Sequence, residues 1–364
     1  MDPFKSTNLF SPNISMLLVT IHESISIAIG SESAARPAIH DLCAGVCFIE
    51  ASRRHADEEP SASDCTFRPP SFSTVEDFCN RVDAQIENIA PQTVCIVSTG
   101  SDCRSAVMET CMKVGAYLLL KKGLDLSAVL RAFRPFHAEL EGTSTDSIRG
   151  QHDVTVASCW EALDQALRLG WLVGPSSRAE PRFDAEEFAH YAHPANGRVH
   201  ILAPGSLLLF PAPAELVGGR EWADPAPAAA RDGPAPPPRR FSAGFSADLL
   251  ADLGASAVLF LDAAPPAAAR AFAARVMAVW GARGAASPLA ALDGLLTLGA
   301  AGGARGGAVA VAGRGGAGGG WPGWIGPVAT AVLVQRHGFP AGAAAAWARM
   351  LCPWMFGGAR GPRE

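Results

Sequence analysis

The segment Gly307–Thr330 constrains the fold more than any other part of this 364-residue chain. Its first residues, Gly307–Val311, are apolar and partly β-branched, which predicts a short buried strand. The stretch Ala312–Gly320 is mostly glycine, and Pro327 suits the first turn of a following helix. A strand, a glycine-rich loop and a helix in this order present backbone N–H groups and a positive helix end to an anion. The loop has no Cys, Ser, Asp or His, so the pattern indicates a phosphate-type loop without reactive side chains.

The same loop satisfies a second pattern, because Gly313–Gly318 reads G-x-G-x-x-G after a strand. A dinucleotide site also requires an acidic residue about twenty positions later to bind the ribose. No acidic residue lies between Asp293 and Glu364, and Trp321-Pro322 interrupts the helix that should begin at the third glycine. Both observations argue against a dinucleotide site.

Composition and charge exclude several classes of partner. A net charge of -5 gives no reason to expect nucleic acid. The nine cysteines include no CxxC pair, so we expect no metal site and no cofactor. We see no secretory signal and expect an intracellular protein with reduced thiols. The run Ile14–Ile29 is interrupted by His22 and Glu23, so we expect no membrane span there. The oligomeric state stays open.

The composition changes along the chain. No lysine follows Lys122, and Ala, Gly, Pro and Arg dominate from about Pro181 onward. One interpretation is a compositionally drifted region that still folds, and the other is a gene model that is partly out of frame. The periodic segments of this half favour a folded protein.

Strand and helix patterns in the first half predict a compact α/β domain. Residues 1–40 are expected to form a tail. Strands are expected at Gly45–Glu50 and Val94–Ser98, and helices after a cap at Ser73 or Thr74, then at Arg104–Lys122 (ended by Gly123), Leu126–Phe133 and Val154–Leu169 (ended by Gly170). The turn Thr99–Asp102 is interpreted as a helix cap, with a phosphate turn as the alternative.

The second half again alternates strands with helices. The elements expected there are a short helix at Phe183–Phe188, strands at Ser206–Phe210 and Ala257–Leu261, and helices at Phe245–Leu253, Ala267–Val279, Pro288–Leu298, 327–337 and 340–351. Residues 211–240 are rich in Pro and Ala and are expected to be a surface insertion, with a proline-dependent partner site as the alternative.

These elements together resemble the mitotic-exit dual-specificity protein phosphatases, the cell-division-cycle fourteen family. The resemblance rests on the order and spacing of short motifs across residues 45–355. They are Cys47, Phe67-Arg68-Pro69, Thr99-Gly100-Ser101-Asp102, Gly115-Ala116-Tyr117-Leu118, Phe133-Arg134-Pro135-Phe136, Val156-Ala157-Ser158-Cys159, Leu169-Gly170-Trp171-Leu172, Phe188-Ala189-His190-Tyr191, Asn196-Gly197, Ile201-Leu202-Ala203-Pro204, Val258–Leu261, Gly307–Val311 and Trp347-Ala348-Arg349.

The resemblance implies an α/β fold of two tandem protein-tyrosine-phosphatase-like domains, each a mixed sheet flanked by helices. We expect a tail at 1–40, a non-catalytic first domain at 41–180, a connector at 181–200 and a second domain at 201–364. In the family the second domain holds the active site. A nuclear or cytoplasmic location is what the resemblance implies.

The chemistry of such a phosphatase requires a thiolate nucleophile, an arginine that grips phosphate oxygens, and an aspartic acid that protonates the leaving alcohol. The family's loop reads His-Cys-x5-Arg after a strand. Laid on this chain, the His position is Ala312, the Cys position Gly313 and the Arg position Gly319, and the acid position lies near Ala282. All of the catalytic side chains are therefore missing together, which leaves a vestigial phosphate loop of Gly313, Arg314, Gly315, Gly316, Gly318 and Gly319.

Four other residues are candidates to take the place of the missing catalytic side chains. Arg314 could touch an anion, although an exposed loop arginine is the simpler interpretation. His337 is expected at the solvated end of a helix. Cys352 is interpreted as a small buried residue, and Cys103 at a helix start as a redox-sensitive thiol at best.

The sequence therefore predicts a catalytically inactive homologue, a pseudophosphatase, that binds phosphoproteins or acts as a scaffold. The first alternative is an active dual-specificity phosphatase whose Cys-x5-Arg loop is lost in this gene model. The second is a folded first domain with a non-functional C-terminal half.

Overall fold

The computed structural model divides the chain into two compact units. Unit 1 comprises Met1–Glu180 and Ala345–Met350, and unit 2 comprises Pro181–Ala344 and Leu351–Glu364. The first division falls at the expected end of the first domain, but the assignment of Ala345–Met350 to unit 1 was not expected. The residues that the structure describes are 6–11, 14–22, 25–30, 46–50, 67–89, 93–99, 104–140, 154–175, 177, 179–224, 239–260, 270–272, 277–280, 292–297, 307–313 and 325–353.

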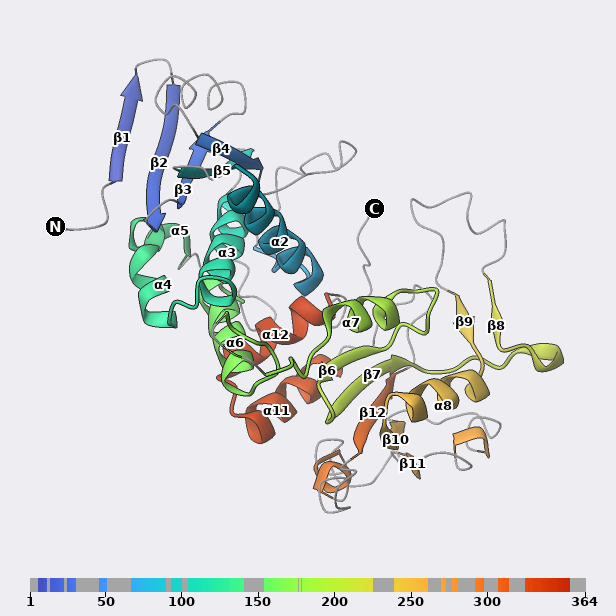
Figure 1. The fold of residues 1–364 in the computed structure, drawn as a ribbon. Coiled ribbons are helices and arrows are strands. Elements are labelled where there is room, and N and C mark those ends of the chain that lie inside the picture. The colour runs from blue at the N-terminus through green and yellow to red at the C-terminus, as the bar shows by residue number, and fades with distance from the viewer. Residues whose placement is uncertain are drawn as a thin grey trace. The chain divides into compact units, whose positions relative to one another are not determined.

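Unit 1 contains a mixed sheet of five strands in the order β1-β2-β3-β5-β4 (Figure 1). β1 pairs with β2 and β2 with β3 in antiparallel fashion, whereas β5 runs parallel to both β3 and β4. The strands are β1 (Ser6–Ser11), β2 (Ile14–His22), β3 (Ile25–Gly30), β4 (Val46–Glu50) and β5 (Thr93–Thr99).

The expectation of a tail at residues 1–40 is wrong, because three of these strands lie there. β3 even occupies the centre of the sheet, next to β5. Isoleucine alternates with small residues in β3, and Ile21, Ile25, Ser26 and Ile27 are all buried. The β-branched isoleucines favour an extended strand, and burial of Ser26 beside them fits the central place of β3 in the sheet. Small polar residues surround these short segments, so the composition of residues 1–40 does not indicate strands.

The helices of unit 1 lie close to the expected positions. They are α2 (Phe72–Ile89), α3 (Arg104–Leu120), α4 (Leu126–Ala132), the 3₁₀ helix η1 (Arg134–Phe136), α5 (His137–Leu140) and α6 (Val156–Arg168). The cap of α2 is Ser71 rather than Ser73 or Thr74, since the Ser71 hydroxyl accepts a hydrogen bond from the Thr74 amide. After α3, Gly123 adopts φ +67°, the left-handed conformation expected of a residue that follows a helix.

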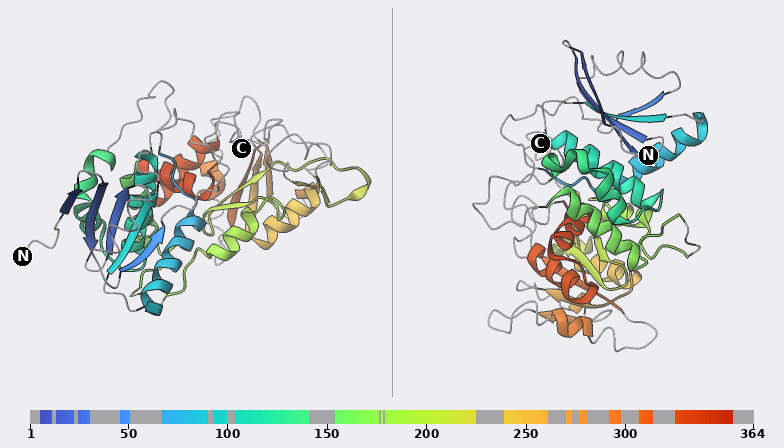
Figure 2. Two further views of the ribbon diagram at one scale, coloured as in Figure 1. Left: turned by 90° about the horizontal axis from the view of Figure 1, so that it is seen from above. Right: turned by 90° about the vertical axis from the view of Figure 1, so that its left-hand side faces the viewer.

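The core of unit 1 forms where α3 meets α6, β5 and α2 (Figure 2). Trp160 of α6 is fully buried, and its indole N–H donates to the carbonyl of Met112 at 3.0 Å. The ring of Phe133 packs against the same indole at 4.7 Å between centroids. α3 approaches this closely because Gly115 faces the indole, where a Cβ atom would lie 2.3 Å from it.

Unit 2 contains a second five-stranded sheet in the order β11-β10-β12-β7-β6. β11, β10, β12 and β7 are parallel to their neighbours, and β6 is antiparallel to β7. The strands are β6 (His200–Ala203), β7 (Leu207–Pro211), β10 (Ala255–Phe260), β11 (Met277–Trp280) and β12 (Ala308–Gly313). Both units are therefore mixed α/β structures, and the alanine-rich half of the chain has a sheet of its own.

The helix expected at Ala267–Val279 is only partly present. Residues 270–272 are helical, but Met277–Trp280 forms β11. Alanine has a high intrinsic helix propensity, which led to the expectation of a helix. Propensity is a weak predictor, and here pairing with the edge of β10 outweighs it. A run as short as Met277–Trp280 cannot be assigned from its pattern alone.

The helices of unit 2 lie near the expected positions. They are α7 (Ala185–Ala192), the 3₁₀ helix η3 (Val217–Gly219), α8 (Ala243–Asp252), α11 (Ile325–His337) and α12 (Ala341–Leu351), and residues 292–297 are also helical. The expected insertion at 211–240 is not simply a loop, because β8 (Trp222–Ala223) pairs with β9 (Arg240–Phe241) at its base. Its residues 225–238 lie outside the described part of the chain.

The contact between Gly115 and Trp160 generates a stability prediction. Gly115→Ala should lower the free energy of unfolding by about 1–3 kcal/mol, since the new methyl group overlaps the indole ring. The matched control is Gly294→Ala, in the helical residues 292–297, where nothing lies within 4 Å of the added atom. That change should stabilise its helix by about 0.5–1 kcal/mol. Chemical denaturation of both variants measures the difference, and equal effects would contradict the proposed overlap.

Candidate functional site

The site indicated by the glycine-rich loop begins at the end of the central strand of unit 2. β12 lies between two parallel strands, with β10 on one side and β7 on the other. Its residues Ala308–Ala312 are all buried. In sheets of this kind ligands bind beyond the carboxyl ends of the strands. The structure therefore places Gly313, the last residue of β12, where a ligand loop is expected.

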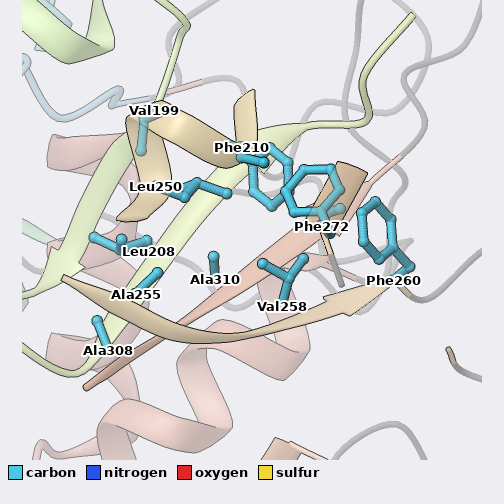
Figure 3. Close-up of a cluster of buried hydrophobic side chains, with 12 residues drawn as sticks. Val199, Leu208, Phe210, Leu250, Ala255, Val258, Phe260, Phe272, Ala308 and Ala310 are labelled. Atoms are coloured by element: carbon cyan, nitrogen blue, oxygen red, sulfur yellow. The ribbon is translucent and has the colours of Figure 1, made fainter. Parts of the chain in front are cut away.

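The side chains beside this end of β12 are apolar. Ala312 is in register with Phe260 of β10 and with Phe210 of β7. Phe272 joins them, 5.1 Å from Phe260 and 6.1 Å from Phe210 between ring centroids (Figure 3). This aromatic group belongs to the buried cluster that also contains Ala308, Ala310 and Ala312. The last residues of β7, β10 and β12 thus carry no group able to attack or protonate a substrate.

The structure describes only some of the predicted site residues. Ala312 and Gly313, at the family's His and Cys positions, end β12. The remaining members of the vestigial phosphate loop (Arg314, Gly315, Gly316, Gly318 and Gly319) lie outside the described residues, as does Ala282 at the family's acid position. The turn at Thr99–Asp102 is described only at Thr99, the last residue of β5, and Cys103 is not described.

The helix that follows the loop begins two residues earlier than expected. α11 starts at Ile325, so Pro327 is its third residue and still lies in the first turn. Proline fits this turn because amides there have no partner within the helix. Thr330 donates from its hydroxyl to the carbonyl of Gly326 at 2.8 Å.

None of the cysteines whose side chains the structure describes is placed as a nucleophile. Cys79, Cys111, Cys159 and Cys352 are all buried. Burial raises the pKa of the Cys79 thiol to about 12 and raises the pKa of the Cys159 thiol as well. A thiol attacks as its thiolate, so a raised pKa removes reactivity at neutral pH. The burial of Cys352 agrees with its interpretation as a small core residue.

His337 differs from the expected solvated residue. It ends α11 but is half-buried, and burial lowers the pKa of its imidazole, helped by the nearby positive charges of Arg182 and Arg336. Arg336 is itself paired with Asp293, with 2.6 Å between the closest nitrogen and oxygen atoms. Burial and these two positive charges therefore favour the neutral imidazole over its protonated form.

Sequence reasoning missed a buried histidine in unit 2. His200 opens β6, and its Nδ1 lies 3.0 Å from the carbonyl oxygen of Leu351. Because a carbonyl only accepts, Nδ1 carries the proton in this contact. Burial lowers the pKa of His200 to about 4, and the positive charge of Arg198 adds to the shift. The one available signal was Asn196-Gly197, a turn that places Arg198 at φ 56° just before β6.

In the part of the chain that the structure describes, no three or more His, Cys, Asp or Glu side chains gather so that they could hold a metal ion. None of the described helices combines the length and the apolar character that crossing a bilayer requires.

Comparison with known proteins finds no family model that matches this chain and no curated protein that matches it.

The burial of His200 predicts a pH dependence of stability. Its pKa of about 4 lies below the ordinary value of 6.5, so the folded protein holds the ring neutral. As the pH falls from 6.5 towards 4, the unfolded chain binds a proton that the folded chain does not. Stability should fall by about 3 kcal/mol across this window.

Denaturation midpoints measured between pH 7 and 4 check this expectation. His200→Asn keeps an N–H donor but removes the titration, and should flatten the dependence. His190→Asn, at an exposed position of α7, is the matched control and should leave it unchanged. An equally steep dependence in the His200 variant would contradict the assignment.

Proposed function

We propose that this chain is a non-catalytic protein of the dual-specificity phosphatase type, which binds phosphorylated proteins and holds them as a scaffold. Its two units are proposed to be tandem phosphatase-like domains. The observation that carries the proposal is the end of β12, where Gly313 stands at the position that requires a nucleophilic cysteine. A glycine there has no atom with which to form a covalent phosphoenzyme.

A substitute nucleophile would have to reach the same place. The thiols of Cys79, Cys111, Cys159 and Cys352 are enclosed in packed cores and do not meet the requirement for an accessible thiolate. The side chains of Phe210, Phe260 and Ala312 are equally unreactive. The described cysteines and the described end of β12 therefore offer no substitute nucleophile.

Binding of an anion would need less than catalysis. Backbone N–H groups of a glycine-rich loop and the start of a helix attract phosphate without a reactive side chain. The order of β12, a glycine-rich sequence and α11 retains that arrangement of elements. Arg314, one residue after β12, is the nearest cation in the sequence. We propose that this loop takes the phosphoryl group of a phosphorylated protein.

The first prediction concerns catalysis. The purified full-length chain should not hydrolyse a generic aryl phosphate above the uncatalysed rate, because no thiolate is available at Gly313. The measurement is the release of the phenol over hours at pH 5.5–7.5. Turnover that is abolished by thiol alkylation would overturn the proposal. Sequencing the transcript across codons 270–360 would then test whether a Cys-x5-Arg loop is encoded.

The second prediction concerns binding. The full-length chain should bind phosphorylated peptides more tightly than the same peptides without phosphate, in a manner that inorganic phosphate competes. Arg314→Ala should weaken the phosphate-dependent part by about tenfold, the loss of one charge-assisted contact. Arg220→Ala, at an exposed position far along the sequence, is the control and should have no effect. Equal affinity for both forms of every peptide would contradict the proposal.

A further inference from the structure

The C-terminal helix α12 supplies part of the core of unit 1. Unit 1 consists of Met1–Glu180 and of Ala345–Met350, which lies far downstream in the sequence. α12 itself spans Ala341–Leu351 (red in Figure 1), so most of its central residues are counted with the N-terminal half of the chain. The sequence between these two pieces of unit 1 forms unit 2 together with Leu351–Glu364.

Trp347 is the large side chain at the centre of this contact. It is fully buried, and its indole meets two aromatic rings of the N-terminal piece. The ring of Phe72, the first residue of α2, lies 6.0 Å away at 60°, an edge-on arrangement. The ring of Trp171, which follows α6, lies 5.8 Å away at 39°. Tilted and edge-on aromatic pairs at these distances are attractive beyond their buried area.

Most of the other buried side chains of α12 near Trp347 are small. Ala345, Ala346 and Ala348 are buried around Trp347, and Met350 is buried one turn further on. Alanine lets a helix backbone approach its neighbours closely, so a single large side chain can enter a pocket between them. α12 thus meets the first residue of α2 and the segment after α6 within unit 1.

We propose that unit 1 carries a binding site for an alanine-rich helix with one tryptophan, and that its occupant is the chain's own α12. The site is formed by Phe72 and Trp171, and Trp347 is the side chain that fills it. α12 is in this sense an intramolecular ligand of unit 1. Ala345–Met350 stay bound to the N-terminal piece of unit 1 through this contact, even when the covalent link at the end of that piece is cut. The proposal does not depend on phosphate binding or on the absence of catalysis.

The proposal is tested in the full-length chain after folding. A protease recognition sequence is inserted at the exposed residues Ala179-Glu180, and the folded protein is then cleaved. The two pieces should remain associated on dilution, as measured by size exclusion and by the dissociation constant from serial dilution. Trp347→Ala should raise this dissociation constant at least about a hundredfold, since a buried aromatic anchor is lost.

Two further variants make the outcome decisive. Trp222→Ala removes an exposed tryptophan of β8 and should change the dissociation constant by less than twofold. Trp347→Phe keeps an aromatic ring and should raise it about tenfold, which gives a reading if the alanine variant does not fold. A dissociation constant that is unchanged in the Trp347 variants would overturn the proposal, as would pieces of the unmodified sequence that separate at once on cleavage.

Discussion

The burial of β12 is the constraint on which unit 2 depends. A strand with a parallel neighbour on each side and both faces covered can hold only apolar residues, and its size is limited by what packs above it. Ala308, Ala310 and Ala312 point to one face, where Phe210, Phe260 and Phe272 meet. The opposite face carries Val309 and Val311, because successive side chains alternate across a strand. Small residues in the strand leave the volume that the aromatic rings fill.

The same complementarity explains how a chain so rich in alanine and glycine can form packed cores. In unit 1 the missing side chain of Gly115 leaves room for the indole of Trp160. Around Trp347 the neighbours along α12 are alanines. At Gly307, just before β12, an added Cβ atom would lie 2.2 Å from that of Ser256. Biased composition therefore does not by itself exclude a specific core, provided that a few large side chains meet the small ones.

Much of the fold could be predicted from local pattern. The strand at Gly307–Val311 and the amphipathic helix over Val156–Arg168 are long or distinctive enough to be assigned from periodicity. The strand Met277–Trp280 was missed because four apolar residues fit a helix equally well, and only the free edge of β10 decides between them. The strand Ile25–Gly30 was missed because its apolar run is short; it pairs locally with β2, but its other partner, β5, lies far along the sequence. Pairing between distant segments is not visible in local pattern.

The candidate site likewise has features that local sequence predicts and features that depend on distant residues. Absence of a nucleophile at Gly313 is a property of the sequence and could be predicted once the strand before it was recognised. Burial of His200 against the carbonyl of Leu351 could not, since the two residues are 151 positions apart.

α12 makes two contacts with residues that are far away in the sequence. Leu351, at its end, binds His200 of unit 2, whereas Trp347, one turn earlier, fills the core of unit 1. Gly313 carries no side chain into either core, so neither core depends on the chemistry of the residue at this position. A substitution at Trp347 would remove a fully buried indole from a core that includes Phe72 and Trp171. The packing of α12 is therefore independent of the chemistry of the loop before α11, since its contacts are made by Trp347 and Leu351 and not by that loop.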